Sequence, residues 1–124
     1  MSSYRVVPVG AVRRRDAEQP NAECVIRVRP ELEPALLGIE PGSRLQILYW
    51  MHGLGEADRE ILQCHPRGDR SRPKRGVFAL RSPMRPNPIG VTEVEVVAVH
   101  GNELTVTGLD ALDGSPVVDI KVAP

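Results

Sequence analysis

The sequence predicts a mainly β fold, an antiparallel barrel or sandwich that carries one or two short helices. Three observations favour this fold class. About seven short strand-like stretches are separated by turn residues. The 124 residues include 12 prolines and 11 glycines, which is unfavourable for a helix bundle. Aromatic residues make up only 3% of the chain, so Val, Leu and Ile must form the core. The length fits one domain, residues 1–124.

The first third of the chain predicts two strands and one short helix. Residues 4–9 form an apolar stretch closed by a glycine, and residues 24–28 alternate well enough for a second strand. The polar segment 13–23 between them is expected to be a loop. A helix is predicted from Pro30 to Gly38, because proline opens it, acids occupy its first turn and glycine ends it.

The middle third predicts a buried strand, a second short helix and a strand that enters a proline-rich loop. Residues 45–51 are almost continuously apolar, a pattern typical of a buried strand. The segment 55–63 is expected to be helical, and 75–80 to be a strand.

The last third predicts a hairpin and a closing strand. Its turn begins with glycine, as a type II′ turn requires, and the strict alternation after it places Leu104 and Val106 on the buried face. The expected elements are strands at 91–97, 104–107 and 117–121, the hairpin turn at 100–103 and a loop at 108–114.

The loop within residues 75–92 is the first candidate site. Its three prolines each fix φ and remove a backbone donor, so it cannot pair as a central strand. A loop this stiff loses little entropy on binding a ligand, which favours a preorganised site wall with Arg81 and Arg85 as its cations. The alternative is a rigid barrel corner whose arginines face water. The loop prolines are Pro83, Pro86 and Pro88.

Charge is unevenly distributed along a chain whose formal net charge is zero. Residues 67–85 carry seven Lys or Arg against the single acid Asp69, whereas residues 93–119 carry six acids and no Lys or Arg. This asymmetry indicates a positive face for an anionic partner such as phosphate or nucleic acid. The two segments could instead neutralise each other across strands.

The cysteines and the N-terminus favour a reduced, cytoplasmic protein. Cys24 and Cys64 form no CxxC pattern and suggest no disulfide framework. No segment reaches membrane-spanning length, and the opening residues contain no apolar signal core. The three histidines fit no standard zinc spacing, so no metal site is predicted.

Two further positions have side chains suited to chemistry. His52 ends the apolar run 48–51, where a strand emerges into a loop, and could donate to a ligand or act as a base. A structural histidine bonded to the backbone is the alternative. Asp110 follows an apolar residue in the loop 108–114 and could offset a cationic ligand or accept a proton. Asp113 precedes glycine and fits an ordinary turn.

Two long ordered motifs resemble the TrmO family, also called TsaA-like or YaeB-like proteins. One is Arg-Gly-Val-Phe-Ala-x-Arg-Ser-x-x-Arg-Pro-Asn-Pro-Ile-Gly at residues 75–90. The other is Gly-Leu-Asp-Ala-Leu-Asp-Gly-x-Pro-Val-x-Asp-Ile-Lys at residues 108–121. With the weaker opening at residues 8–13, the resemblance covers most of the chain.

The resemblance implies a non-Rossmann β-barrel methyltransferase that uses S-adenosylmethionine and works as a homodimer. The family activity is N6-methylation of threonylcarbamoyladenosine in tRNA. The positions that the resemblance assigns to cofactor binding are Gln19, Pro20, His52, Gly53, Arg81, Leu109, Asp110, Ala111 and Leu112.

Residue chemistry agrees with this assignment. A carboxylate at Asp110 would hold the cationic end of the cofactor, and Arg81 offers a bidentate partner for its carboxylate. His52 and Asp110 are the candidates for the catalytic base. Two alternatives stay open, a small-molecule methyltransferase on the same barrel and a non-catalytic module that binds cofactor or RNA. The residues expected to contact an anionic substrate such as tRNA are Arg85, Asn87, Arg72 and Lys74.

Overall fold

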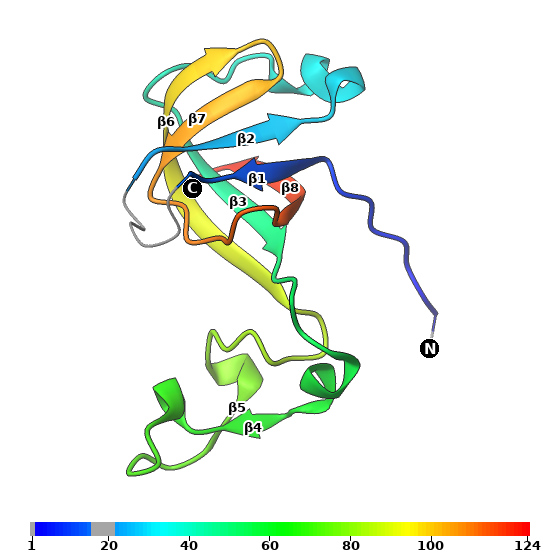
Figure 1. Cartoon of the computed structure of the whole chain (residues 1–124), viewed down its shortest axis with the longest axis vertical. Coiled ribbons are helices and arrows are strands. Elements are labelled where there is room, and N and C mark those ends of the chain that lie inside the picture. The colour runs from blue at the N-terminus through cyan, green and yellow to red at the C-terminus, as the bar shows by residue number, and fades with distance from the viewer. Residues whose placement is uncertain (1, 16–21) are drawn as a thin grey trace.

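The computed structural model describes residues 2–15 and 22–124 and contains a closed antiparallel barrel in the order β1-β2-β7-β6-β3-β8 (Figure 1). The predicted mainly β barrel is therefore confirmed. Consecutive strands often pair, but β3 lies between β6 and β8, which brings the middle and the end of the chain together. The barrel strands are β1 Gly10–Arg13, β2 Cys24–Val28, β3 Arg44–Trp50, β6 Ile89–His100, β7 Glu103–Thr107 and β8 Pro116–Val122.

The barrel interior is filled by aliphatic side chains from every strand. Leu104 and Val106 are fully buried, as the strict alternation of that segment predicted. The segment 45–51 was expected to be buried throughout, but only alternate residues of β3 face inward. A barrel strand has one interior face, so its other side chains stay partly exposed. The largest fully buried side chains of the barrel include Val12, Ile26, Ile47, Val94, Val96 and Val117.

A second, smaller lobe is formed by the chain between β3 and β6 and projects from one end of the barrel (Figure 1, green). It is built from short 3-10 turns and a two-stranded sheet instead of long elements. Val77 is the buried apolar anchor of this lobe. Its elements are η2 Glu56–Glu60, β4 Gln63–Cys64, η3 Pro66–Gly68, β5 Arg75–Gly76 and η4 Val77–Ala79.

Four predicted elements, two strands and two helices, differ from the structure. The strand expected at 4–9 is absent, and the first strand is β1. Tyr4, Val6 and Val7 are exposed, and only Val9 at the end of that segment packs against the core. The strand expected at 75–80 ends after β5, where the 3-10 turn η4 begins. The two predicted helices are 3-10 turns. In η1, Pro30–Leu36, an internal proline removes a donor that an α-helix would use.

Both cysteines are free, as the sequence predicted. Cys24 lies in the barrel core, where burial raises the pKa of its thiol despite the opposing charge of Arg14. The thiol therefore stays protonated and packs as a small apolar group. Within residues 2–15 and 22–124, no helix has the length and apolarity needed to cross a membrane.

Gly10 is the tightest backbone contact of the barrel. A Cβ at this position would lie 2.5 Å from the carbonyl oxygen of Arg27 on the paired strand. The Gly10→Ala variant is therefore expected to lose about 1–3 kcal/mol of unfolding free energy, a typical cost of overpacking. Thermal or urea denaturation measures this loss. The control is Gly76→Ala, whose Cβ would have no neighbour closer than 3.9 Å; equal stability of both variants would contradict the account.

Candidate functional site

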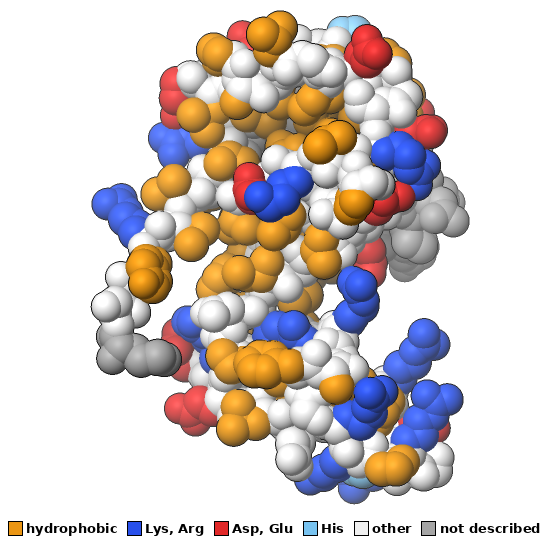
Figure 2. Space-filling view, turned by 180° about the vertical axis from the view of Figure 1, so that it is seen from behind, with side chains coloured by type: hydrophobic (Ala, Val, Ile, Leu, Met, Phe, Trp, Pro, Cys, Tyr) orange, Lys and Arg blue, Asp and Glu red, His pale blue; other side chains and the backbone are white. Residues whose placement is uncertain are grey.

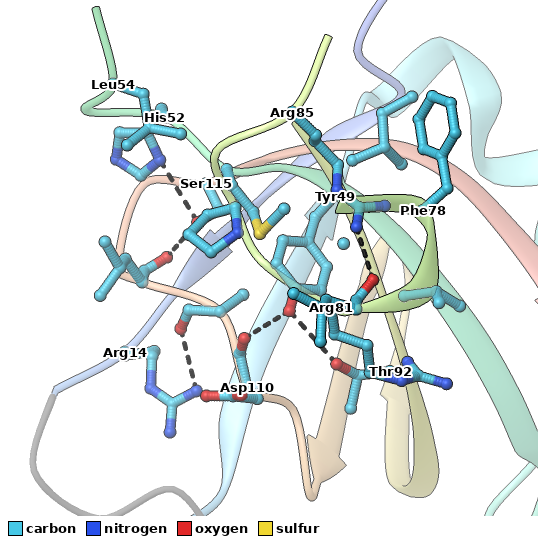
Figure 3. Close-up of a pocket in the computed structure, with 18 of the residues that line it drawn as sticks. Arg14, Tyr49, His52, Leu54, Phe78, Arg81, Arg85, Thr92, Asp110 and Ser115 are labelled. Carbon is cyan, nitrogen blue, oxygen red and sulfur yellow. Dashed lines mark hydrogen bonds between the residues drawn. The ribbon is translucent and has the colours of Figure 1, made fainter. Parts of the chain in front are cut away.

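A cavity of about 860 Å³ opens where β3 leaves the barrel and β6 enters it, between the barrel and the second lobe (Figure 3). Its volume lies within the range of small-molecule sites. Five segments far apart in the sequence meet here. The residues that line the cavity include Arg14, Tyr49, His52, Phe78, Arg81, Arg85, Gly90, Asp110, Ala111, Leu112 and Ser115.

Arg14 holds the loop between β7 and β8 against the end of β1. Its guanidinium Nη1 donates to the carbonyl of Leu109 and, at 3.0 Å, to that of Ala111. Its backbone N–H donates to Asp113 Oδ1 at 2.8 Å, a contact across 99 residues of sequence. Asp113 and Gly114 themselves form the expected turn. Arg14 was not among the predicted site residues. Its only signal in the sequence was its place as the second of three consecutive arginines, residues 13–15.

Tyr49 fixes the same loop from inside the barrel. Its hydroxyl donates to the backbone carbonyl of Asp110 at 2.5 Å, so its oxygen accepts from the hydroxyl of Thr92 at 3.3 Å. Gly90 is paired with Tyr49 across β3 and β6 and leaves room for the ring. Tyr49 stands at an inward-facing position of its strand, and a buried tyrosine needs a partner for its hydroxyl, so this position could have indicated the contact.

Gly90 therefore sets the position of this hydrogen-bonded pair. A Cβ on Gly90 would lie 2.6 Å from Cζ of Tyr49, so in Gly90→Ala the ring must move and lose its bond to the Asp110 carbonyl. We expect ligand affinity at the cavity to fall about tenfold, the cost of about one hydrogen bond. Calorimetric titration measures it. Tyr49→Phe keeps the ring and should show a similar loss; unchanged affinity in both variants would contradict the account.

His52 and Ser115 form a second contact at the cavity edge. Ser115 is 1% exposed, and its Oγ donates to the carbonyl of Leu112 at 2.6 Å. The hydroxyl has one proton, so towards His52 Nδ1, 3.4 Å away, it can only accept. This contact favours the Nδ1–H tautomer and leaves Nε2 of His52 as a free acceptor.

The two arginines of the proline loop have different surroundings. Arg85 donates through Nε to the carbonyl of Ser82 at 2.7 Å and through Nη2 to the carbonyls of Val77 and Leu80. These bonds hold the loop in shape. Arg81 is exposed and lines the cavity, and within residues 2–15 and 22–124 it makes no hydrogen bond or ion pair. Arg81 is thus the loop cation with donors left for an anionic ligand.

The loop 109–112 contributes both core packing and cavity surface. Leu109 is fully buried and fixes the loop from beneath, whereas Leu112 is 61% exposed at the cavity. Phe78 of the second lobe also lines the cavity and is 84% exposed, so the two side chains give the cavity an apolar rim. Asp110 and Arg14 line the same cavity (Figure 3).

The remaining predicted site residues lie around or away from the cavity. Gly53 follows His52 and has a φ of 88°, but it does not line the cavity. Asn87 Oδ1 accepts from Arg59 Nη2 at 3.4 Å, while Arg59 also lies over the Trp50 ring. Arg72 lines a second cavity described below, and Lys74 is exposed on the same lobe. Gln19 and Pro20 lie outside the described residues.

No group of three or more His, Cys, Asp or Glu side chains able to hold a metal ion occurs in residues 2–15 and 22–124. Among the described residues, the cavity lining combines the unpaired cation Arg81, the carboxylate of Asp110 and apolar walls. The fold and the cavity together define a small antiparallel β-barrel protein whose cavity at one barrel end has side chains suited to a zwitterionic ligand with an apolar part.

Comparison with known proteins identifies the family. The model of the tRNA-methyltransferase O N-terminal domain matches residues 10–123, and the chain belongs to this family. It is 46% identical to a probable S-adenosyl-L-methionine-binding protein of Methanothermobacter thermautotrophicus, over 94% of this chain and 88% of that one. A protein of Archaeoglobus fulgidus named S-adenosyl-L-methionine-binding protein is 44% identical, over 86% of this chain and 73% of its own.

Solved structures show the same fold. The crystal structure of TrmO from Pseudomonas aeruginosa superposes with a TM-score of 0.72 and is 28% identical. The superposition covers 99% of this chain but only 57% of the TrmO chain. A second TrmO crystal structure gives a TM-score of 0.75 at 30% identity and 58% coverage of that chain. This chain thus spans just over half the length of these TrmO proteins.

Proposed function

We propose that this protein is an S-adenosylmethionine-dependent methyltransferase that acts on N6-threonylcarbamoyladenosine in tRNA. Family membership and the relatives named S-adenosyl-L-methionine-binding proteins support the methyltransferase. The single structural observation that carries the proposal is the cavity in Figure 3, where Arg81, Asp110 and an apolar rim face one another. The proposed acceptor, tRNA, would place the protein in the cytoplasm.

The side chains of the cavity fit this cofactor. Arg81, with its donors free, suits the cofactor carboxylate, because guanidinium and carboxylate pair bidentately. Asp110 suits the cationic amino and sulfonium end. Ala111, Leu112 and Phe78 offer apolar surface for an adenine ring. The bound cofactor supplies a methyl group activated by attachment to a sulfonium.

The protein's own contribution to the reaction is alignment and proton removal. Loop 109–114, fixed by Arg14 and Tyr49, holds the donor side of the cavity without reorganisation during the reaction. Methyl transfer would form the N6–CH3 bond as the S–CH3 bond breaks and a neutral thioether leaves, and Nε2 of His52, whose other nitrogen contacts Ser115, would accept the proton that N6 gives up. Between His52 and Asp110 as bases, this contact favours His52 and leaves Asp110 to hold the cationic end.

Methyl incorporation tests the proposal directly. Radiolabelled S-adenosylmethionine is incubated with the protein and tRNA that carries threonylcarbamoyladenosine but lacks the N6-methyl mark. We expect label in tRNA, and no label when the tRNA lacks the threonylcarbamoyl group. Cofactor binding without incorporation into tRNA would overturn the acceptor assignment and leave the cofactor site standing.

We also propose that the protein acts as a homodimer, as the family resemblance implies. A chain of 124 residues buries a modest core, and association would add buried area. Large apolar side chains are also exposed away from the cavity, among them Leu37 and Val122, and a second copy would cover such surface. Sedimentation equilibrium at micromolar concentration should show a dimer, and a monomer would contradict this part of the proposal.

A further inference from the structure

A second cavity, of about 870 Å³, lies on the projecting lobe beside β4 and β5. Figure 2 shows Lys and Arg side chains gathered on this lobe. Two segments form the walls, 64–75 and 80–84. The basic residues among them are Arg67, Arg70, Arg72, Arg75 and Arg81.

The positive charge of this cavity is largely uncompensated. Arg72 pairs with Asp69 at 3.7 Å, while Arg67, Arg70, Arg75 and Arg81 form no ion pair with any described residue. Asp69 accepts two bonds from Ser71, which lower the pKa of its carboxyl, so this acid stays charged but offsets one arginine. Five guanidinium groups around one cavity repel each other unless an anion binds among them.

The cavity wall is held in shape by its own backbone. His65 Nδ1 lies 2.7 Å from the carbonyl oxygen of Arg72, and the N–H of Asp69 donates to the carbonyl of Pro66 at 3.0 Å. Arg67 has a φ of 53°, the one left-handed value of a non-glycine residue among those described. This conformation is uncommon for a residue with a side chain, and it fixes the direction in which Arg67 leaves the loop.

The two cavities share a wall. Leu80, Arg81 and Pro83 line both, so an anion in the second cavity would lie one loop away from a ligand in the first. We propose that the arginine-lined cavity binds the phosphodiester backbone of the RNA that presents its base to the first cavity. This inference rests on the proposed function. RNA is favoured over a free anion because the four guanidinium groups other than that of Arg81, which the cofactor uses, still offer more donors than one phosphate accepts, whereas a strand brings several phosphates.

The test is binding of fluorescent tRNA transcript to the full chain over a range of salt concentrations. The test variant carries both Arg67→Gln and Arg70→Gln. The control variant carries both Arg27→Gln and Arg44→Gln, which remove the same number of positive charges from barrel strands. We expect the first variant to weaken RNA binding about tenfold or more and to reduce the salt slope by about 1.5, the value for two phosphate contacts. The control should lose much less, and cofactor affinity should be unchanged in both.

Three outcomes would overturn the inference. Equal loss in both double variants would mean general electrostatic attraction, and no loss in the first would mean that the cavity does not contact RNA. If inorganic phosphate displaces the RNA at concentrations well below those at which chloride does, the cavity binds a free anion instead. Failure of the proposed function would give a different result: the protein would transfer no methyl group, but RNA binding would still depend on Arg67 and Arg70.

Discussion

Replacement of His52 by glutamine is expected to reduce methyl transfer about 100-fold or more, the usual contribution of a general base. Glutamine keeps a polar side chain of similar length but cannot take up a proton at neutral pH. Cofactor affinity should change little, because Arg81, Asp110 and the apolar rim remain in place. Single-turnover transfer under saturating cofactor and tRNA separates the chemical step from binding.

The matched control for this variant is His100→Gln. His100 ends β6 at its turn with β7 and does not line the cavity, so this variant should keep full activity. Ser115→Ala removes the group that contacts Nδ1 of His52 and should lower the transfer rate, with a further loss of cofactor affinity because the Ser115 hydroxyl also bonds the Leu112 carbonyl. If His52→Gln retains full activity and Asp110→Asn loses it without loss of cofactor binding, Asp110 is the base.

Replacement of Arg81 by alanine is expected to weaken cofactor binding about 10- to 100-fold, because a charge-assisted hydrogen bond contributes roughly 1.5–3 kcal/mol. Arg81 is exposed, and its donors are bonded to no described residue, so the variant should fold with unchanged stability. Calorimetric titration of S-adenosylmethionine measures the change in affinity.

Two comparisons make this prediction specific. Arg81→Lys keeps the charge without the bidentate fork and should recover part of the affinity. Arg85→Ala should act differently, because Arg85 donates to three carbonyls of its own loop and its loss should lower stability as well as binding. Wild-type affinity in Arg81→Ala would contradict the proposed carboxylate partner.

The barrel could be predicted because its signals are local. The alternation in 104–107 and the glycine of the 100–103 turn each act over a few residues and agree with one another. The segments predicted wrongly are those whose structure depends on distant partners. In residues 4–9 the apolar side chains of Tyr4, Val6 and Val7 are exposed, and the strand expected at 75–80 ends at Gly76, where the 3-10 turn η4 buries Val77.

The candidate site likewise has residues that could be predicted from the sequence and residues that could not. Charged and loop residues such as Arg81, Asp110 and His52 stand out in the sequence and converge on one cavity in the structure. The residues that hold them were not predicted. Arg14 and Tyr49 act through bonds to backbone carbonyls about 95 and 61 residues away, and no local pattern indicates such a partner.

The most direct test of the central claim is calorimetric titration of S-adenosylmethionine into the purified protein in the absence of RNA. The account predicts saturable binding with one site per chain, because the cavity is already formed by Arg14, Tyr49 and the proline loop. Binding should be lost or strongly weakened in Arg81→Ala and retained in His52→Gln. Absence of binding to the wild-type protein would contradict the assignment of this cavity to the cofactor.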